Sequence, residues 1–331
     1  MNRLFAAVLF AVLILSVGCS GRDGKDEPTV TTSPASPGAN APATTVTATV
    51  AATATRGAAM PKGVSHATLT SGGLERTYRL FVPSSAKASD KLPLVIGLHG
   101  GLGWGDQFAA NSNFETLAEA EGFIVAFPDG TNRTWNAGSC CGQASSKNID
   151  DVGFLASLIQ HLAATLPVDG NRIYMTGHSN GGMMSFRFGC ERPDLVRGVA
   201  PVAGSLEIPK CQPTRGTSLL AIHGDADQNH PIEGGEGDRS IAGVPFVSMD
   251  DSLSRWTSGM QCEANPSHST AGALTTTLWK GCRDGATATF IVIADADHPW
   301  PGGVARAGVQ DRVSDKLDAT LAVWSFFKTL R

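Results

Sequence analysis

The residues best suited to chemistry lie in one short stretch, Gly177-His178-Ser179-Asn180-Gly181. An apolar run precedes it and a helix-compatible segment follows, a context that predicts a nucleophile elbow between a strand and a helix. Glycine fits Gly177 and Gly181 because the backbone of such a turn passes close to neighbouring elements. The hydroxyl of Ser179 would lie exposed at the strand end, near the positive end of the helix dipole. The alternative is a glycine-rich turn whose serine only caps the helix.

An acid and a base are expected at the carboxyl ends of neighbouring strands, where open α/β sheets hold their functional groups. Asp225 and Asp227 follow the predicted strand 218–222, and His298 follows the last predicted strand. The order Ser179, Asp227, His298 is that of the α/β-hydrolase fold. We therefore predict these three as the catalytic residues, with Asp225 as the rival acid and His230 as the rival base.

The segment His99-Gly100-Gly101 follows another apolar strand, 92–98. Glycines there allow a backbone N–H to point at a substrate oxygen. We predict an oxyanion hole made by the N–H groups of Gly101 and Asn180. A tight turn with no further role is the alternative.

The elements that must position these residues read as one α/β domain over residues 66–331. Predicted strands cover 66–70, 75–82, 92–98, 123–127, 173–176, 196–202, 218–222, 275–279 and 287–293, and predicted helices cover 114–121, 151–166, 183–190, 249–260 and 317–330. Alternation of strands and helices predicts a mostly parallel sheet covered by helices on both faces.

The amino-terminal part predicts export. Residues 1–18 have one positive charge and then a short apolar run, as in a signal peptide. Gly18-Cys19 is similar to the end of a bacterial lipoprotein signal, which would attach Cys19 to a membrane; an ordinary cleaved signal is the alternative. Residues 19–65 are rich in Thr, Ala, Pro and Ser and predict a disordered tether.

Composition excludes some partners and cofactors. With 26 basic and 30 acidic residues, the chain offers no electrostatic case for binding nucleic acid. Six cysteines follow Cys19, an even number that in an exported protein favours disulfides over metal ligation. No cysteine or histidine cluster has zinc spacing, so we expect neither a metal nor an organic cofactor.

Several blocks in order resemble one family. They are 98–101, Trp135-Asn136 with Cys140-Cys141-Gly142, 150–154, 177–183, 200–204, His223-Gly224 with Asp227, and His298 with 300–302. The chain thereby resembles the polyhydroxybutyrate depolymerase and feruloyl esterase group of exported α/β-hydrolases. The resemblance implies catalysis by the same three residues and esters of hydroxyalkanoates or plant phenolic acids as substrates. Together with proximity in sequence, it suggests the disulfides Cys190–Cys211 and Cys262–Cys282.

The predicted substrate contacts are Trp135, Asn136, His178 and Trp300. The two tryptophans flank the predicted site and could line an acyl or phenolic pocket; the alternative is that they pack their own loops.

The predicted function is that of an exported serine esterase acting on hydroxyalkanoate oligomers or short acyl esters. The first alternative is a carbohydrate esterase of feruloyl or acetyl-xylan type. An envelope acyltransferase and a non-catalytic surface lipoprotein are further alternatives, and the intact Ser, Asp and His order argues against the last.

Overall fold

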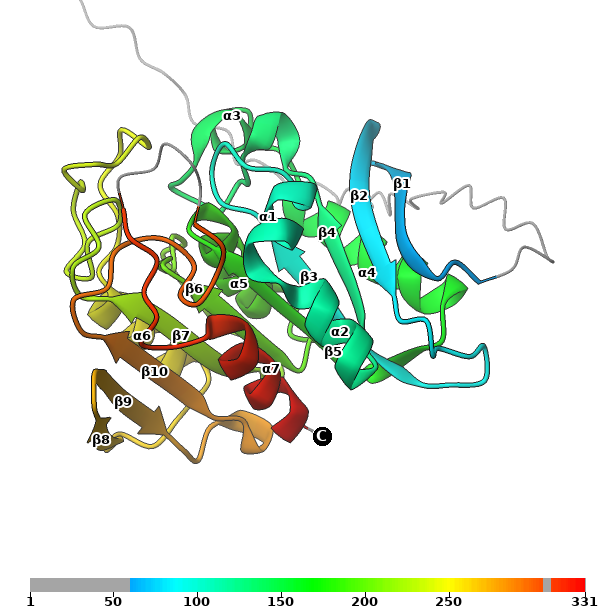
Figure 1. Ribbon diagram of the computed structural model, residues 1–331. Coiled ribbons are helices and arrows are strands. Elements are labelled where there is room, and N and C mark those ends of the chain that lie inside the picture. Colours follow the sequence, from blue (N-terminus) through cyan, green and yellow to red (C-terminus); the bar gives the residue numbers. More distant parts are fainter. Residues whose placement is uncertain (1–59, 306–310, 331) are drawn as a thin grey trace, which may run out of the picture. The chain divides into compact units, whose positions relative to one another are not determined.

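The computed structural model describes residues 60–305 and 311–330, and these fall within one compact unit (Figure 1). The predicted signal peptide, Cys19 and most of the predicted tether lie outside the described residues. The first strand begins at Gly63, three residues before the predicted domain boundary. Within the described residues, no helix has the length and apolar character needed to cross a membrane.

A single mixed sheet forms the centre of the domain, in the order β1-β2-β4-β3-β5-β6-β7-β10-β9-β8. The strands are β1 (Gly63–Ser71), β2 (Leu74–Val82), β3 (Leu92–Leu98), β4 (Ile124–Pro128), β5 (Val168–His178), β6 (Gly198–Val202), β7 (Ser218–Gly224), β8 (Ser267–Ala271), β9 (Leu274–Trp279) and β10 (Ala288–Ile293). From β4 to β10 in this order the neighbours are parallel, and antiparallel strands flank them at both edges. The predicted α/β architecture is confirmed.

Helices cover both faces of the sheet (Figure 1). They are α1 (Gly105–Ser112), α2 (Phe114–Glu121), α3 (Gly142–Ser146), α4 (Asp151–Thr165), α5 (Asn180–Glu191), α6 (Met249–Gly259) and α7 (Ala319–Thr329). Alternation along β3 divides the core: Leu94 and Ile96 pack with residues of α4, α5 and α6, whereas Val95 packs with residues of α1, α2 and α7. A strand that buries both faces therefore reads as a continuous apolar run.

Helices α1 and α3 and strand β8 were not predicted from the sequence, and the reason is clear for two of them. Helix α1 follows the glycine-rich turn after β3 and has only a short apolar face, with Phe108 and Ala109 buried. Strand β8 is exposed along its whole length, so no apolar alternation marks it. It carries His268. Strand β8 forms through backbone pairing with β9 at the sheet edge.

Candidate active site

Ser179 lies at the sharp turn between β5 and α5, with φ 55° and ψ −122°, a conformation that L-residues rarely adopt. Both flanking glycines are required by close packing. A Cβ on Gly177 would lie 2.5 Å from the carbonyl of Gly181, and one on Gly181 would lie 2.3 Å from the carbonyl oxygen of Leu98. The sequence thus folds here into the strained turn that defines a nucleophile elbow, and packing around the turn maintains the strain.

His298 and Asp227 meet beyond the carboxyl ends of β10 and β7. The Nδ1 of His298 lies 2.7 Å from Oδ2 of Asp227. When Nδ1–H donates to the carboxylate, Nε2 is the ring nitrogen that can accept a proton. The backbone N–H groups of Asn229 and His230 both donate to Oδ1 of Asp227, each at 2.9 Å. Burial alone would raise the pKa of Asp227, but the charge of His298 and its hydrogen bond hold that pKa well below its usual range.

The rival acid and base have other partners. Asp225 is exposed and accepts a hydrogen bond from the backbone N–H of Asp295 at 2.6 Å. His230 lies beside the cavity, but its Nδ1 faces the carbonyl oxygen of Ala203 at 3.0 Å and its Nε2 faces Oγ of Ser205 at 2.9 Å. Burial lowers the pKa of His230 to about 3. Neither ring nitrogen of His230 is placed to take a proton from Ser179.

The loop after β3 packs directly against the elbow. A Cβ on Gly100 would lie 3.4 Å from Cβ of Ser179, and one on Gly101 would lie 3.9 Å from Cβ of Asn180. The buried side chain of His99 holds this loop by two hydrogen bonds. Its Nδ1–H donates to the carbonyl of Gly100 at 2.8 Å, and its Nε2 accepts from the N–H of Gly130 at 2.9 Å. Burial lowers the pKa of His99 to about 4. The arrangement brings the two predicted oxyanion-hole residues together.

One cavity of about 260 Å³ contains these groups. Ser179, His298, Gly101 and Asn180 line it. Among the residues that sequence reasoning missed, Gln107, Thr134, Cys141, Met183, Ile241 and Phe246 also line it. Met183 carried a signal, because it lies four residues after Ser179 and so on the same side of α5. Phe246 and Ile241 carried none, since they belong to an irregular segment between β7 and α6.

The side chain of Asn180 holds one wall of this cavity, the segment from Thr134 to Cys141. Its Oδ1 accepts from the backbone N–H of Trp135 at 2.7 Å, and its Nδ2 donates to the carbonyl of Trp135 at 3.0 Å. Both residues are buried. The segment that supplies Thr134 and Cys141 to the cavity is thereby fixed to the residue that follows Ser179.

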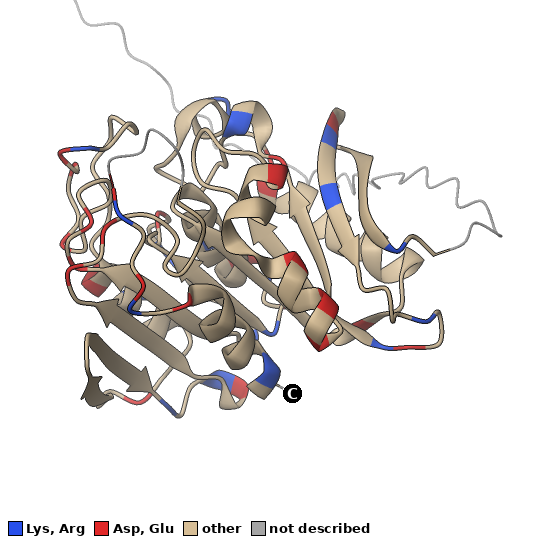
Figure 2. Cartoon of the chain, in the orientation of Figure 1, with Lys and Arg blue, Asp and Glu red and all other residues tan. Residues whose placement is uncertain are grey.

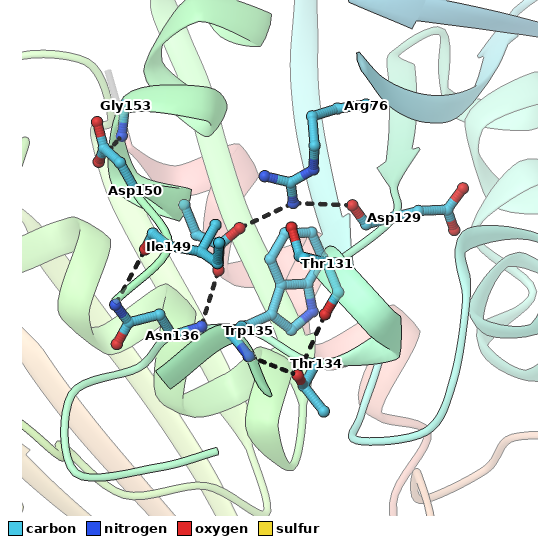
Figure 3. Close-up of polar contacts among 12 residues, drawn as sticks. Arg76, Asp129, Thr131, Thr134, Trp135, Asn136, Ile149, Asp150 and Gly153 are labelled. Atoms are coloured by element: carbon cyan, nitrogen blue, oxygen red, sulfur yellow. Dashed lines mark hydrogen bonds and ion pairs between the residues drawn. The ribbon is translucent and has the colours of Figure 1, made fainter. Parts of the chain in front are cut away.

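A buried polar network holds the same wall from behind (Figure 3). Arg76 of β2 pairs with Asp151 of α4 at 2.8 Å, with side chains 5% and 0% exposed, and also donates to the carbonyl of Asp129. The other carboxylate oxygen of Asp151 accepts from the N–H of Asn136. Burial raises the pKa of Asp151, while this N–H and Arg76 oppose the rise. The Asn136 amide donates to the carbonyl of Ile149 at 2.9 Å.

Three of the four predicted substrate contacts are therefore placed behind the cavity. Trp135 is fully buried and donates from Nε1 to the carbonyl of His99, and Asn136 is buried in the network just described. Trp300 is 4% exposed, donates to Oγ1 of Thr320 at 3.0 Å and packs edge-on against Phe108. None of the three lines the cavity. The expected contacts are corrected to packing positions, because each side chain has its partners inside the protein.

His178 does line the cavity. Its Nε2 lies 2.8 Å from the carbonyl oxygen of His298, and the two imidazole rings are 4.8 Å apart. The residue before Ser179 thus contacts the backbone of the loop that carries His298.

The described part of the chain contains three disulfides, Cys190–Cys211, Cys262–Cys282 and Cys140–Cys141. The first two are the expected pairs. The third joins adjacent residues, and Cys141 lines the cavity. Within residues 60–305 and 311–330, no group of three or more His, Cys, Asp or Glu side chains is arranged to hold a metal ion.

Comparison with known proteins gives a consistent set of relatives. Residues 76–206 match the family described as esterase PHB depolymerase. The chain is 28% identical to the "Putative esterase NocK" of Nocardia uniformis subsp. tsuyamanensis, over 96% of each chain. It is 31% identical to the feruloyl esterase C of Emericella nidulans, over 55% of this chain and 67% of the relative. The fold is shared with the acetyl xylan esterase from Aspergillus awamori, with TM-score 0.55 and 16% identity over 74% of this chain and 96% of that one.

Proposed function

The chain belongs to the PHB depolymerase and feruloyl esterase family of carboxylic ester hydrolases, and from that premise we propose that its catalysis runs through Ser179, Asp227 and His298. The observation that carries the proposal is the 2.7 Å contact between Nδ1 of His298 and Oδ2 of Asp227. It orients the imidazole of a residue that shares one cavity with the elbow serine. Ester hydrolysis by a serine nucleophile requires this arrangement of acid, base and nucleophile.

In the proposed reaction, Oγ of Ser179 attacks the ester carbonyl carbon while Nε2 of His298 takes the hydroxyl proton. The carbonyl oxygen becomes an oxyanion, which the N–H groups of Gly101 and Asn180 stabilise. The tetrahedral intermediate then expels the alkoxide, which takes the proton from His298. Water enters, gives a proton to His298, and cleaves the acyl-enzyme by the same steps. Asp227 holds the imidazole in the required tautomer and stabilises its charged form.

The substrates proposed are short acyl esters or hydroxyalkanoate oligomers. A cavity of about 260 Å³ lies at the small end for ligand sites, which favours a short acyl chain over a long one. Met183, Phe246 and Ile241 offer apolar surface to such a chain, and Gln107 offers a polar amide. The second candidate is a feruloyl or acetyl ester of a polysaccharide, which the names of two relatives support.

We further propose that the enzyme works outside the cytoplasm, and that a lipid on Cys19 attaches it to the envelope. Three disulfides support export, because such bonds persist in oxidising compartments. We expect the Cys19→Ala variant, which removes the residue that would carry the lipid, to be released from membranes.

The catalytic proposal is tested with Ser179→Ala on a panel of p-nitrophenyl acetate, p-nitrophenyl butyrate, hydroxybutyrate oligomers and methyl ferulate. We expect a folded variant whose kcat/KM falls on the order of 10³-fold or more on every ester. Retention of wild-type turnover would show that another residue is the nucleophile. The relative kcat/KM values of the wild-type enzyme decide between the two substrate classes.

A further inference from the structure

A second cavity, of about 440 Å³, lies near the amino-terminal ends of β7 and β10. The candidate active site lies at the opposite ends of these strands. The lining of the second cavity comes from residues 209–213, which precede β7, from the last turns of α6, and from Arg283, which precedes β10. The candidate catalytic residues follow the carboxyl ends of these two parallel strands. The seven residues of β7 therefore separate the two sites by roughly 20 Å. The two cavities share no lining residue.

The second cavity is positively charged. Lys210, Arg255 and Arg283 line it, and its lining includes no carboxylate. Elsewhere in the domain acidic and basic residues are interspersed (Figure 2), and the chain as a whole has a net charge of −4. Asp251 approaches Arg255 only to 4.0 Å and its side chain is 70% exposed, so it neutralises that charge weakly. The collected charge favours an anion.

The cations are not needed to cap the end of α6. The carbonyls of Trp256, Thr257 and Ser258 accept hydrogen bonds from the backbone N–H groups of the residues that follow the helix. The carbonyl of Met260 accepts from the N–H of Arg283 at 2.7 Å. Three of the last four carbonyls of the helix are thus already paired with backbone N–H groups.

One side-chain donor of Arg283 has no partner among the described residues. The Nε–H of Arg283 is buried without a hydrogen bond to any described residue. A buried donor left unpaired costs about 1–3 kcal/mol, so such groups in native proteins are usually paired with water or a ligand. The Nε atom itself is shielded from the cavity, so what Arg283 contributes to the lining is its positive charge.

Disulfides fix the polar lining in place. Lys210 and Gln212 flank Cys211, Gln261 precedes Cys262, and Arg283 follows Cys282. The bonds Cys190–Cys211 and Cys262–Cys282 tie these short segments to the rest of the domain. Less ordering is then required when a ligand binds, which is the advantage of a pre-organised site.

We propose that this cavity is an accessory binding site for an acidic saccharide. A sugar carboxylate would accept hydrogen bonds from the guanidinium of Arg283, with Lys210 and Arg255 adding charge. The amides of Gln212 and Gln261 would bind hydroxyls of the same chain. Their presence favours a polyhydroxylated ligand over a bare inorganic anion. The site would hold a polymer to the enzyme independently of the ester reaction.

The test measures binding by isothermal titration calorimetry with a galacturonate hexamer, a neutral xylose hexamer and inorganic phosphate. The two variants are Arg283→Gln and Lys210→Gln, and Lys210 is exposed, so its replacement does not disturb the core. The matched control is Lys87→Gln, at an exposed position on the β2–β3 connection. We expect the galacturonate hexamer to bind the wild-type protein with a Kd below about 1 mM. Arg283→Gln should weaken binding about tenfold and Lys210→Gln about threefold, with no change for Lys87→Gln.

Three results would overturn the proposal. One is absence of galacturonate binding up to about 10 mM. Another is equal weakening by all three variants, which would indicate non-specific charge attraction. The third is binding of phosphate or of the neutral hexamer as tight as that of galacturonate. Because binding is measured without turnover, a failed Ser179 assignment leaves these outcomes unaffected.

Discussion

Replacing Asn180 by alanine tests whether the elbow and the cavity wall are joined as the structure indicates. The change removes two buried hydrogen bonds to the backbone of Trp135 and keeps the N–H of residue 180. The carbonyl of Trp135 retains the N–H groups of Ala137 and Cys141 as donors. The N–H of Trp135 has Asn180 as its acceptor and would be left buried without one, at a cost of about 1–3 kcal/mol. We expect the free energy of unfolding to fall by about 2–3 kcal/mol.

The assay is urea unfolding combined with hydrogen exchange of the peptide that covers residues 134–142. Exchange in that peptide should accelerate more than in the rest of the domain, because the wall opens locally. Tyr174→Phe is the matched control, since it removes one hydrogen bond, to the carbonyl of Leu330, away from the cavity. An unfolding free energy within 0.5 kcal/mol of wild type, with unchanged exchange, would refute the idea that Asn180 holds the wall.

Three further predictions address the acid, the packing and the pH dependence. Asp227→Asn should lower kcat by about 10⁴-fold, whereas Asp225→Asn should keep kcat within about tenfold; the reverse ranking would move the acid to Asp225. Trp300→Ala should lower the free energy of unfolding, measured by urea titration, by about 3–5 kcal/mol and should reduce activity on all esters alike. Trp104 is 44% exposed, so the control Trp104→Ala should lower that free energy by less than about 1 kcal/mol. Because His99 has a pKa of about 4 in the folded protein and about 6.5 unfolded, its contribution to stability is complete above pH 6.5 and falls by about 3 kcal/mol as the pH drops to 4. His99→Gln should flatten that fall in urea titrations across the range, and an unchanged slope would contradict the assignment.

Local patterns were sufficient to predict the elements that carry the candidate triad. Gly177 and Gly181 mark a turn that excludes side chains, and the apolar runs before Asp227 and His298 place both residues at one edge of the sheet. These features depend on neighbours in sequence, or on the general topology of parallel sheets. The contact of His298 with Asp227 follows from that topology once the strand order is known.

The roles of Trp135 and Trp300 could not be read in the same way. Proximity to the site in sequence was a sound reason to expect aromatic contacts with substrate, but it does not tell which side of a loop a ring occupies. Trp135 turns inward because its indole N–H finds the carbonyl of His99, and Trp300 because its indole N–H finds Thr320. Such partners lie 20 or more residues away along the chain, and only the folded structure brings them together. Phe246 likewise lines the cavity only because the fold brings its segment there.

The central claim is that Ser179 is the nucleophile, and covalent labelling tests it most directly. The enzyme is treated with diethyl p-nitrophenyl phosphate, which traps activated serines, and the adduct is located by intact mass and peptide mapping. We predict one adduct per chain, on Ser179, appearing in step with loss of esterase activity and absent from His298→Ala. Complete loss of activity with Ser179 unmodified, or an adduct on another serine that accounts for the loss, would contradict the claim.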